Sequence, residues 1–198
     1  VISVAAELAD VADHSDDATI AVEAAYILGI AEFWQGRFDA ARTHFERALQ
    51  RYQPRDRHTH LLRYGYDPKV VALARLANIS WFRGEPEQAR SMREQAAAWA
   101  TEIGHPYSRS AAAVFGALLA VDMGDVADIR RCTEELAAVG DIDSSAHIRV
   151  IGAAMSGYVD VLDRSGSVAA IRNAVDAFTP TDPMPGLHAI LARILVAA

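Results

Sequence analysis

Two helical patterns joined by a glycine turn, over residues 24–53, constrain the fold of this chain more than any other feature. Apolar and small residues recur at spacings of three and four on both sides of Gly36, which interrupts the pattern. Gly29 and Ala41 would let the two helices approach closely, with Phe45 filling the space between them. Such a hairpin cannot bury both of its faces alone, so the pattern predicts a stack of similar hairpins.

The rest of the chain contains further turns of the same kind. Gly36, Gly84, Gly124 and Gly166 each follow an apolar helical stretch and precede an alanine-rich one, at intervals of 48, 40 and 42 residues. These turns predict an all-α, antiparallel helical-hairpin solenoid, forming a single domain over residues 1–198. The expected hairpins span about 18–53, 68–103, 107–139 and 145–178, and terminal helices flank them. Because the chain opens without methionine and stops within a helical pattern, we expect it to be a fragment of a longer protein.

Composition narrows the functional classes. The formal net charge is −7, which argues against direct nucleic-acid binding, because phosphate neutralisation needs clustered Lys and Arg. No apolar run is long enough to span a bilayer, so we expect a cytoplasmic protein without membrane contact. The single cysteine, Cys132, cannot form an internal disulfide and is expected to pack in the core.

A search for catalytic motifs predicts no enzyme. The chain has no G-x-x-x-x-G-K-S/T loop, no H-E-x-x-H, no C-x-x-C and no G-x-S-x-G. His58 and His60 could place two imidazoles near a metal ion, but the arginines around them disfavour a cation. We therefore expect no catalytic residues, no cofactor and no metal site.

The first helices of successive hairpins are expected to line a concave face that binds a partner. Aromatic residues precede the turn glycines of the first two hairpins, where packing between neighbouring repeats is the competing interpretation. The predicted partner-binding residues are Tyr26, Phe33, Trp34, Arg75, Asn78 and Trp81, with Glu23 on the same face. A groove with this composition would suit an extended or helical peptide.

Residues 54–66 lengthen the first interval and do not follow the hairpin pattern. They belong to the most basic part of an acidic chain, and we interpret them as a solvated loop. The alternative is an electrostatic contact with an acidic partner, for which Arg57, Tyr64 and Tyr66 are candidate contact residues.

The spacing Leu28-Gly29, Ala41-x3-Phe45, Ala48 resembles the tetratricopeptide pattern. Residues 24–119 further resemble the tetratricopeptide-like regions of large bacterial signalling proteins. In that family the region follows a STAND- or AAA-type ATPase module, with a nucleotide cyclase or a LuxR-type DNA-binding domain in the same polypeptide. The segment from Tyr64 to Val70 is similar to the family's Tyr-Gly-Gln-Asp-Pro-Gly-Val, with Tyr66 and Lys69 as departures. The resemblance transfers no catalytic residue.

Two hypotheses about function follow. The first is a non-catalytic interaction and regulatory module, which binds a protein, a peptide or a neighbouring domain and couples it to an attached ATPase or effector in bacterial signalling. Self-association into a homo-oligomer is left open. The alternative is a small-molecule sensor that binds an inducer in a cavity between repeats, near Trp34, Tyr64, Tyr66 and Trp81.

Overall fold

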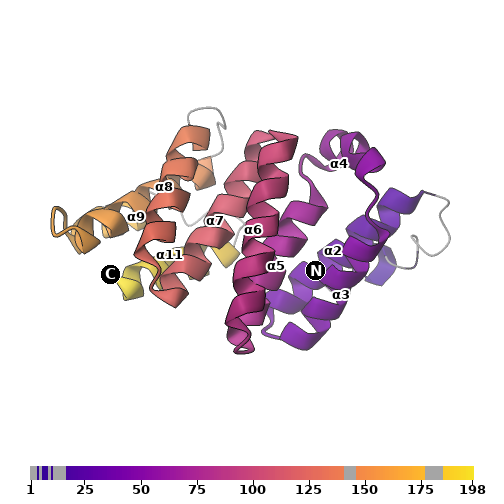
Figure 1. Cartoon of the computed structure of the whole chain (residues 1–198), viewed down its shortest axis with the longest axis horizontal. Coiled ribbons are helices and arrows are strands. Elements are labelled where there is room, and N and C mark those ends of the chain that lie inside the picture. The colour runs from indigo at the N-terminus through magenta and orange to yellow at the C-terminus, as the bar shows by residue number, and fades with distance from the viewer. Residues whose placement is uncertain (1–3, 5, 9, 11–16, 141–145, 177–184) are drawn as a thin grey trace. The chain divides into compact units, whose positions relative to one another are not determined.

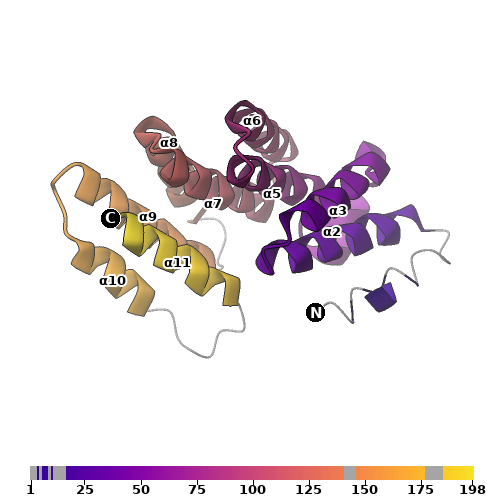
Figure 2. The ribbon, with the colours of Figure 1, turned by 90° about the horizontal axis from the view of Figure 1, so that it is seen from below.

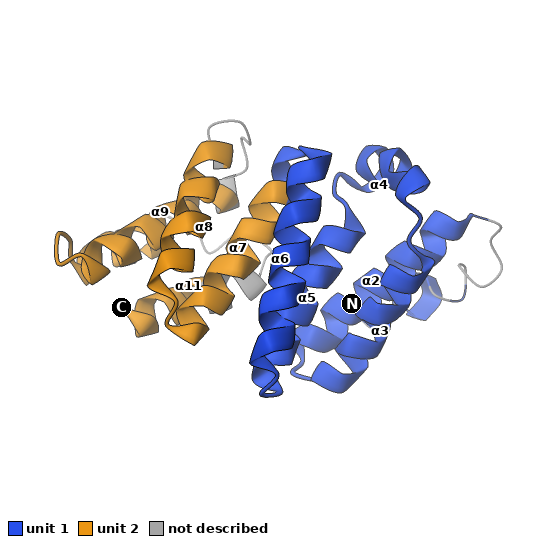
Figure 3. Cartoon of the chain, viewed as in Figure 1, with its two compact units in different colours: residues 1–108 blue, residues 109–198 orange. Residues whose placement is uncertain are grey.

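The computed structural model describes residues 17–140, 146–176 and 185–198, together with residues 4, 6–8 and 10 (Figure 1). These residues form helices and turns and contain no strand, which confirms the all-α prediction. The chain divides into two compact units, residues 1–108 and 109–198 (Figure 3). The expected amino-terminal helix lies largely outside the described residues.

The first unit contains two helical hairpins and a short helical insertion between them. The first hairpin pairs α2 (Ala18–Trp34) with α3 (Phe38–Arg51), and the second pairs α5 (Pro68–Phe82) with α6 (Pro86–Ile103). Figure 2 shows the helices of each hairpin side by side. Helix α3 also packs on α5, so the two hairpins are neighbours. The observed pairs fall within the expected ranges 18–53 and 68–103.

Local sequence chemistry sets the ends of these helices. Asp17 and Asp67 cap the amino termini of α2 and α5 by accepting backbone N–H groups, and Pro68 occupies the first turn of α5. Gly36 and Gly84 adopt φ values of 72° and 76°, the left-handed region in which a side chain would be strained. Glycine at these two positions therefore lets each helix reverse into its partner.

The first hairpin is held by close contact between small and aromatic residues. Phe45 and Ala41 of α3 are fully buried, and the ring of Phe45 lies directly against Gly29 of α2. A Cβ atom on Gly29 would lie 2.7 Å from two ring carbons of Phe45. Phe45 and Ile79 of α5 belong to one apolar cluster, so the same ring also joins the first hairpin to the second.

The second unit contains the remaining helices. These are α7 (Pro106–Met123), which begins in the first unit, α8 (Val126–Gly140), α9 (Ala146–Leu162), α10 (Val168–Asp176) and α11 (Pro185–Ala197). One buried cluster draws apolar residues from all five, among them Met155, Leu191 and Ile194. Cys132 is buried in this cluster, which agrees with the expected packing role.

The insertion corrects one sequence-based expectation. Residues 54–66 are not a solvated loop but a 3₁₀ turn, η1 (Pro54–Asp56), followed by α4 (Arg57–Tyr64), which ends at Gly65 in the left-handed conformation. The arginine-rich composition indicated solvent on all sides, whereas His60 is fully buried. Its burial depends on contacts with distant residues, which the local pattern does not show.

Candidate functional site

Aromatic residues on either side of the first turn glycine, Gly36, and just before the second, Gly84, form a row at one end of the hairpins, here called the turn-end surface: Phe33, Trp34, Phe38 and Phe82. The ring centroids of Phe33 and Phe38 lie 5.7 Å apart, and those of Phe38 and Phe82 lie 5.0 Å apart. Trp34 meets Phe33 edge to face at 5.6 Å. The row therefore runs from α2 across the start of α3 to the end of α5.

Two members of this row occupy equivalent places in successive repeats and remain open to solvent. Trp34 lies two residues before Gly36, and Phe82 lies two residues before Gly84. Trp34 is 42% exposed and Phe82 is 41% exposed. Large aromatic side chains are usually more buried than this, and they are enriched where proteins bind other proteins.

A buried arginine, Arg75, packs against two rings of the turn-end surface. The guanidinium carbon of Arg75 lies 4.4 Å from the ring centre of Phe33 and 4.6 Å from that of Trp34. Arg75 itself is only 5% exposed. The cation–π contacts hold both rings in place, so the exposed Trp34 ring packs on buried neighbours, Phe33 and Arg75.

The predicted partner-binding residues thus differ in accessibility. Phe33, Arg75 and Asn78 are buried, Tyr26 and Trp81 are half-buried, and Trp34 is exposed. Glu23, expected on the same accessible face, is 1% exposed. Trp34 is the member of the predicted set best placed for direct contact, and Phe82, which was not in the set, is placed equally well.

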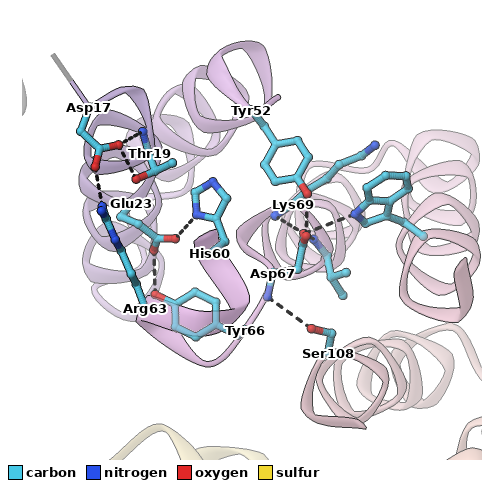
Figure 4. A network of polar contacts seen from close by, with 12 residues as sticks. Asp17, Thr19, Glu23, Tyr52, His60, Arg63, Tyr66, Asp67, Lys69 and Ser108 are labelled. Carbon is cyan, nitrogen blue, oxygen red and sulfur yellow. Dashed lines mark hydrogen bonds and ion pairs between the residues drawn. The ribbon is translucent and has the colours of Figure 1, made fainter. Parts of the chain in front are cut away.

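A second group of residues forms a buried polar network around α4 (Figure 4). His60 Nδ1 lies 2.7 Å from a carboxylate oxygen of Glu23, and the hydroxyl of Tyr66 donates to the other oxygen at 2.9 Å. The ring of Tyr52 stacks on His60 with centroids 5.5 Å apart. The carboxylate of Glu23, on α2, is therefore shared between α4 and the segment that follows it.

Asp67 is the centre of the other half of this network. Its carboxylate accepts the Tyr52 hydroxyl at 2.6 Å and the Trp99 indole N–H at 3.3 Å, besides capping α5. Its backbone N–H donates to the hydroxyl of Ser108 at 3.2 Å. The network thus ties the end of α3, the start of α5, α6 and the first turn of α7 within the first unit.

The environment of the two tyrosines fixes their role in the network. Burial, together with neighbouring Tyr26 and the negative charge of Glu23, raises the pKa of Tyr66 far above its ordinary value. Burial and the hydrogen bond to Asp67 raise the pKa of Tyr52 in the same way. Both hydroxyls therefore stay protonated and donate to carboxylates, which is a structural role.

The candidate contact residues of the insertion lie in or beside this network. Tyr66 bonds to Glu23 and packs on Tyr26, Tyr64 lies beside the His60 ring, and Arg57 is half-buried. His58 is exposed while His60 is buried, so the two imidazoles point in different directions. Within the described ranges, no group of three or more His, Cys, Asp or Glu side chains is arranged to hold a metal ion.

Sequence reasoning missed most of this network. It did not connect Asp67 with Tyr52 or Trp99, and it gave His60 no buried role. The tyrosines and the aspartate of the Tyr64–Val70 segment were the available signal, because a buried tyrosine hydroxyl usually finds a hydrogen-bond partner. The partner carboxylate of Glu23, 37 residues away from His60, could not be inferred locally.

Comparison with known proteins agrees with the geometry of the first hairpin. A model of the tetratricopeptide repeat family matches residues 22–54, which include most of α2 and all of α3. Neither a curated protein nor a solved structure matches the chain. None of the described helices is long and apolar enough to cross a membrane. The chain therefore contains a tetratricopeptide-like region, and repeats of this kind generally mediate protein–protein interaction and are usually non-catalytic.

Proposed function

We propose that this chain is a non-catalytic interaction module that binds a protein or peptide through the turn-end surface. The observation that carries the proposal is the exposure of Trp34 and Phe82 at equivalent positions of two successive hairpins. Exposed aromatic residues held on a rigid support lose little conformational freedom on binding, and they are common energetic anchors of interfaces. The tetratricopeptide-like character of residues 22–54 supports the same class of function.

The proposal extends to coupling within a larger protein. Residues 24–119 resemble the regions that follow ATPase modules in bacterial signalling proteins, and this resemblance supports a role in passing the bound state of the module to an attached ATPase or effector. The partner is either a separate protein or another domain of the same polypeptide. The present chain would contribute the recognition step, and the attached module would contribute the chemistry.

The test begins with a photo-crosslinker in the full-length gene product. The protein is produced in its native host with p-benzoylphenylalanine in place of Trp34, and irradiation should link this residue covalently to the bound partner. Mass spectrometry then identifies the partner. The purified partner is titrated against wild type, Trp34→Ala, Phe82→Ala and, as a control on the exposed face of α6, Arg90→Ala. Truncating an aromatic anchor commonly costs about 2 kcal/mol or more, so Trp34→Ala should weaken binding at least roughly tenfold.

Circular dichroism must show normal helicity in each variant. Arg75→Ala is a poor probe of binding, because this buried side chain supports the Phe33 and Trp34 rings and its loss would disturb the fold. Full affinity of both aromatic variants, combined with a loss of affinity in Arg90→Ala, would overturn the proposal. The coupling step is tested separately, by asking whether the partner changes ATP turnover in the wild-type gene product and fails to do so with Trp34→Ala.

A further inference from the structure

Helix α4 exposes a face that combines positive charge with a large apolar side chain. Arg55, in the preceding 3₁₀ turn, His58 and Leu62 follow one another at spacings of three and four residues, which places them on one side. Arg55 is 83% exposed on its side chain, Leu62 is 86% exposed, and His58 is also exposed. We call these three residues the α4 face.

The charge of this segment contrasts with the rest of the chain. Residues 51–63 contain four arginines and one aspartate, a net charge of 4 − 1 = +3. The formal charge of the whole chain is −7, so the remaining residues carry −7 − 3 = −10. The α4 face therefore lies in the basic segment of an acidic protein, and its own arginine, Arg55, lies 3.8 Å from the carboxylate of Asp56. A basic segment attracts acidic groups and repels other basic ones.

The opposite side of α4 fixes the orientation of this face. His60 is fully buried against Glu23 and Tyr52, and Arg63 forms an ion pair with Asp17 at the start of α2. Three contacts to two other helical elements hold a helix of eight residues. An exposed leucine alone would be unremarkable, but Leu62 is held in a fixed position on the same side as Arg55, within the basic segment.

We infer that the α4 face is a docking surface for an acidic segment of a partner protein, in which Asp or Glu side chains flank an apolar residue. Arginine guanidinium groups bind carboxylates through paired, charge-assisted hydrogen bonds, and Leu62 would cover the apolar side chain. A nucleic acid fits less well, since binding a phosphate backbone needs many basic contacts and the chain as a whole carries a formal net charge of −7.

This surface is separate from the turn-end surface. Glu23, which holds α4, and Trp34 are 34 − 23 = 11 residues apart on α2, about 16 Å along the helix axis. The inference goes beyond the proposed function, because it names a different surface and a different partner chemistry. Either surface can therefore fail its test while the other passes.

The test uses the full chain and fluorescein-labelled peptides of defined sequence. The probe is the 12-residue peptide with four Glu-Glu-Leu repeats, and the comparison probes replace Leu with Ser or Glu with Lys. A 12-nucleotide single-stranded DNA is the nucleic-acid probe. Fluorescence anisotropy is measured in 50 mM and 200 mM salt. We expect saturable binding of the Glu-Glu-Leu peptide that weakens with salt, and binding at least fivefold weaker for both comparison peptides.

Matched variants assign the binding to α4. Leu62→Ser and Arg55→Glu should each weaken binding of the Glu-Glu-Leu peptide at least fivefold. Two control variants should leave the affinity for this peptide unchanged: Val196→Ser, at a residue 88% exposed on α11, and Arg172→Glu, at an exposed arginine on α10. Trp34→Ala should also leave it unchanged, which separates this surface from the turn-end surface.

Three outcomes would overturn the inference. One is the absence of saturable binding to the Glu-Glu-Leu peptide. Another is equal affinity for the Ser-containing peptide, which would remove the role of Leu62. The last is tighter binding of the DNA, lost in Arg55→Glu and retained in Leu62→Ser, which would assign the face to nucleic acid.

Discussion

Replacing Gly29 with alanine tests the packing of the first hairpin with a single methyl group. The added Cβ would lie 2.7 Å from Cδ1 and Cε1 of Phe45 and 3.0 Å from Cγ, closer than carbon atoms normally approach. Phe45 is fully buried, and it packs among Ala41, Ala72 and Ile79. The ring can move away only by displacing these neighbours, so the methyl group cannot be accommodated without cost.

Two opposing effects determine the expected change in the free energy of unfolding. Overpacking a well-filled core costs about 1–3 kcal/mol, and this contact lies toward the upper end because it involves ring atoms near the Phe45 backbone. Alanine is favoured over glycine within a helix by about 1 kcal/mol, which offsets part of that cost. We therefore expect Gly29→Ala to destabilise the first unit by about 1–2 kcal/mol.

Urea denaturation followed by tryptophan fluorescence measures this change selectively. The three tryptophans, Trp34, Trp81 and Trp99, all lie within residues 1–108, so the signal reports the first unit. The matched control is Gly152→Ala in α9, where an added Cβ would meet Leu136 at an ordinary 3.9 Å. Without a clash, this control should gain up to about 1 kcal/mol from helix propensity, measured by circular dichroism.

A double-mutant cycle identifies the clash as the cause. In a Phe45→Leu background the smaller side chain leaves room for the methyl group, so Gly29→Ala should cost clearly less there than in wild type. An unchanged or increased stability of Gly29→Ala would refute the observed helix contact. The same cost in both backgrounds would place the strain somewhere other than at Phe45.

The remaining predictions concern the polar contacts of α2 and α4. Hydrogen bonds from Thr19 and Arg63 lower the pKa of Asp17 from its ordinary 3.8 to about 2, so its ionised form stabilises the folded state above pH 4, and this contribution is lost as the pH falls toward 2. Asp17→Asn keeps the helix cap but lacks the charge, so the stability difference from wild type should shrink between pH 4 and 2; a constant difference across that range would contradict the assignment. His60→Ala should cost about 2–4 kcal/mol in urea denaturation, because the buried Glu23 carboxylate loses its contact with His60 and keeps the hydrogen bond from Tyr66. Exposed His58→Ala should change stability by less than about 0.5 kcal/mol. Equal costs for the two histidine variants would mean that α4 is not anchored through His60.

The sequence alone determined the hairpins of the first unit, because their signals are local. Gly36 and Gly84 permit the left-handed turns, Asp67 followed by proline begins α5, and small residues at helical spacing mark the faces that meet. Each of these depends on backbone conformation or on neighbours within one or two helical turns. Such preferences act regardless of what the remainder of the chain does, so they could be recognised without a structure.

Only the tertiary structure decided which polar and aromatic side chains are buried. The arginines near His60 in the sequence indicated a solvated side chain. In the structure His60 is buried, and Glu23, from a different helix, provides the carboxylate that its ring nitrogen contacts. Arg75 looked accessible but is buried against the rings of Phe33 and Trp34, and at the end of α5 Phe82 is exposed whereas Trp81 is half-buried. The physical reason is that burial depends on the rotation and contacts of whole helices, which arise from residues tens of positions apart.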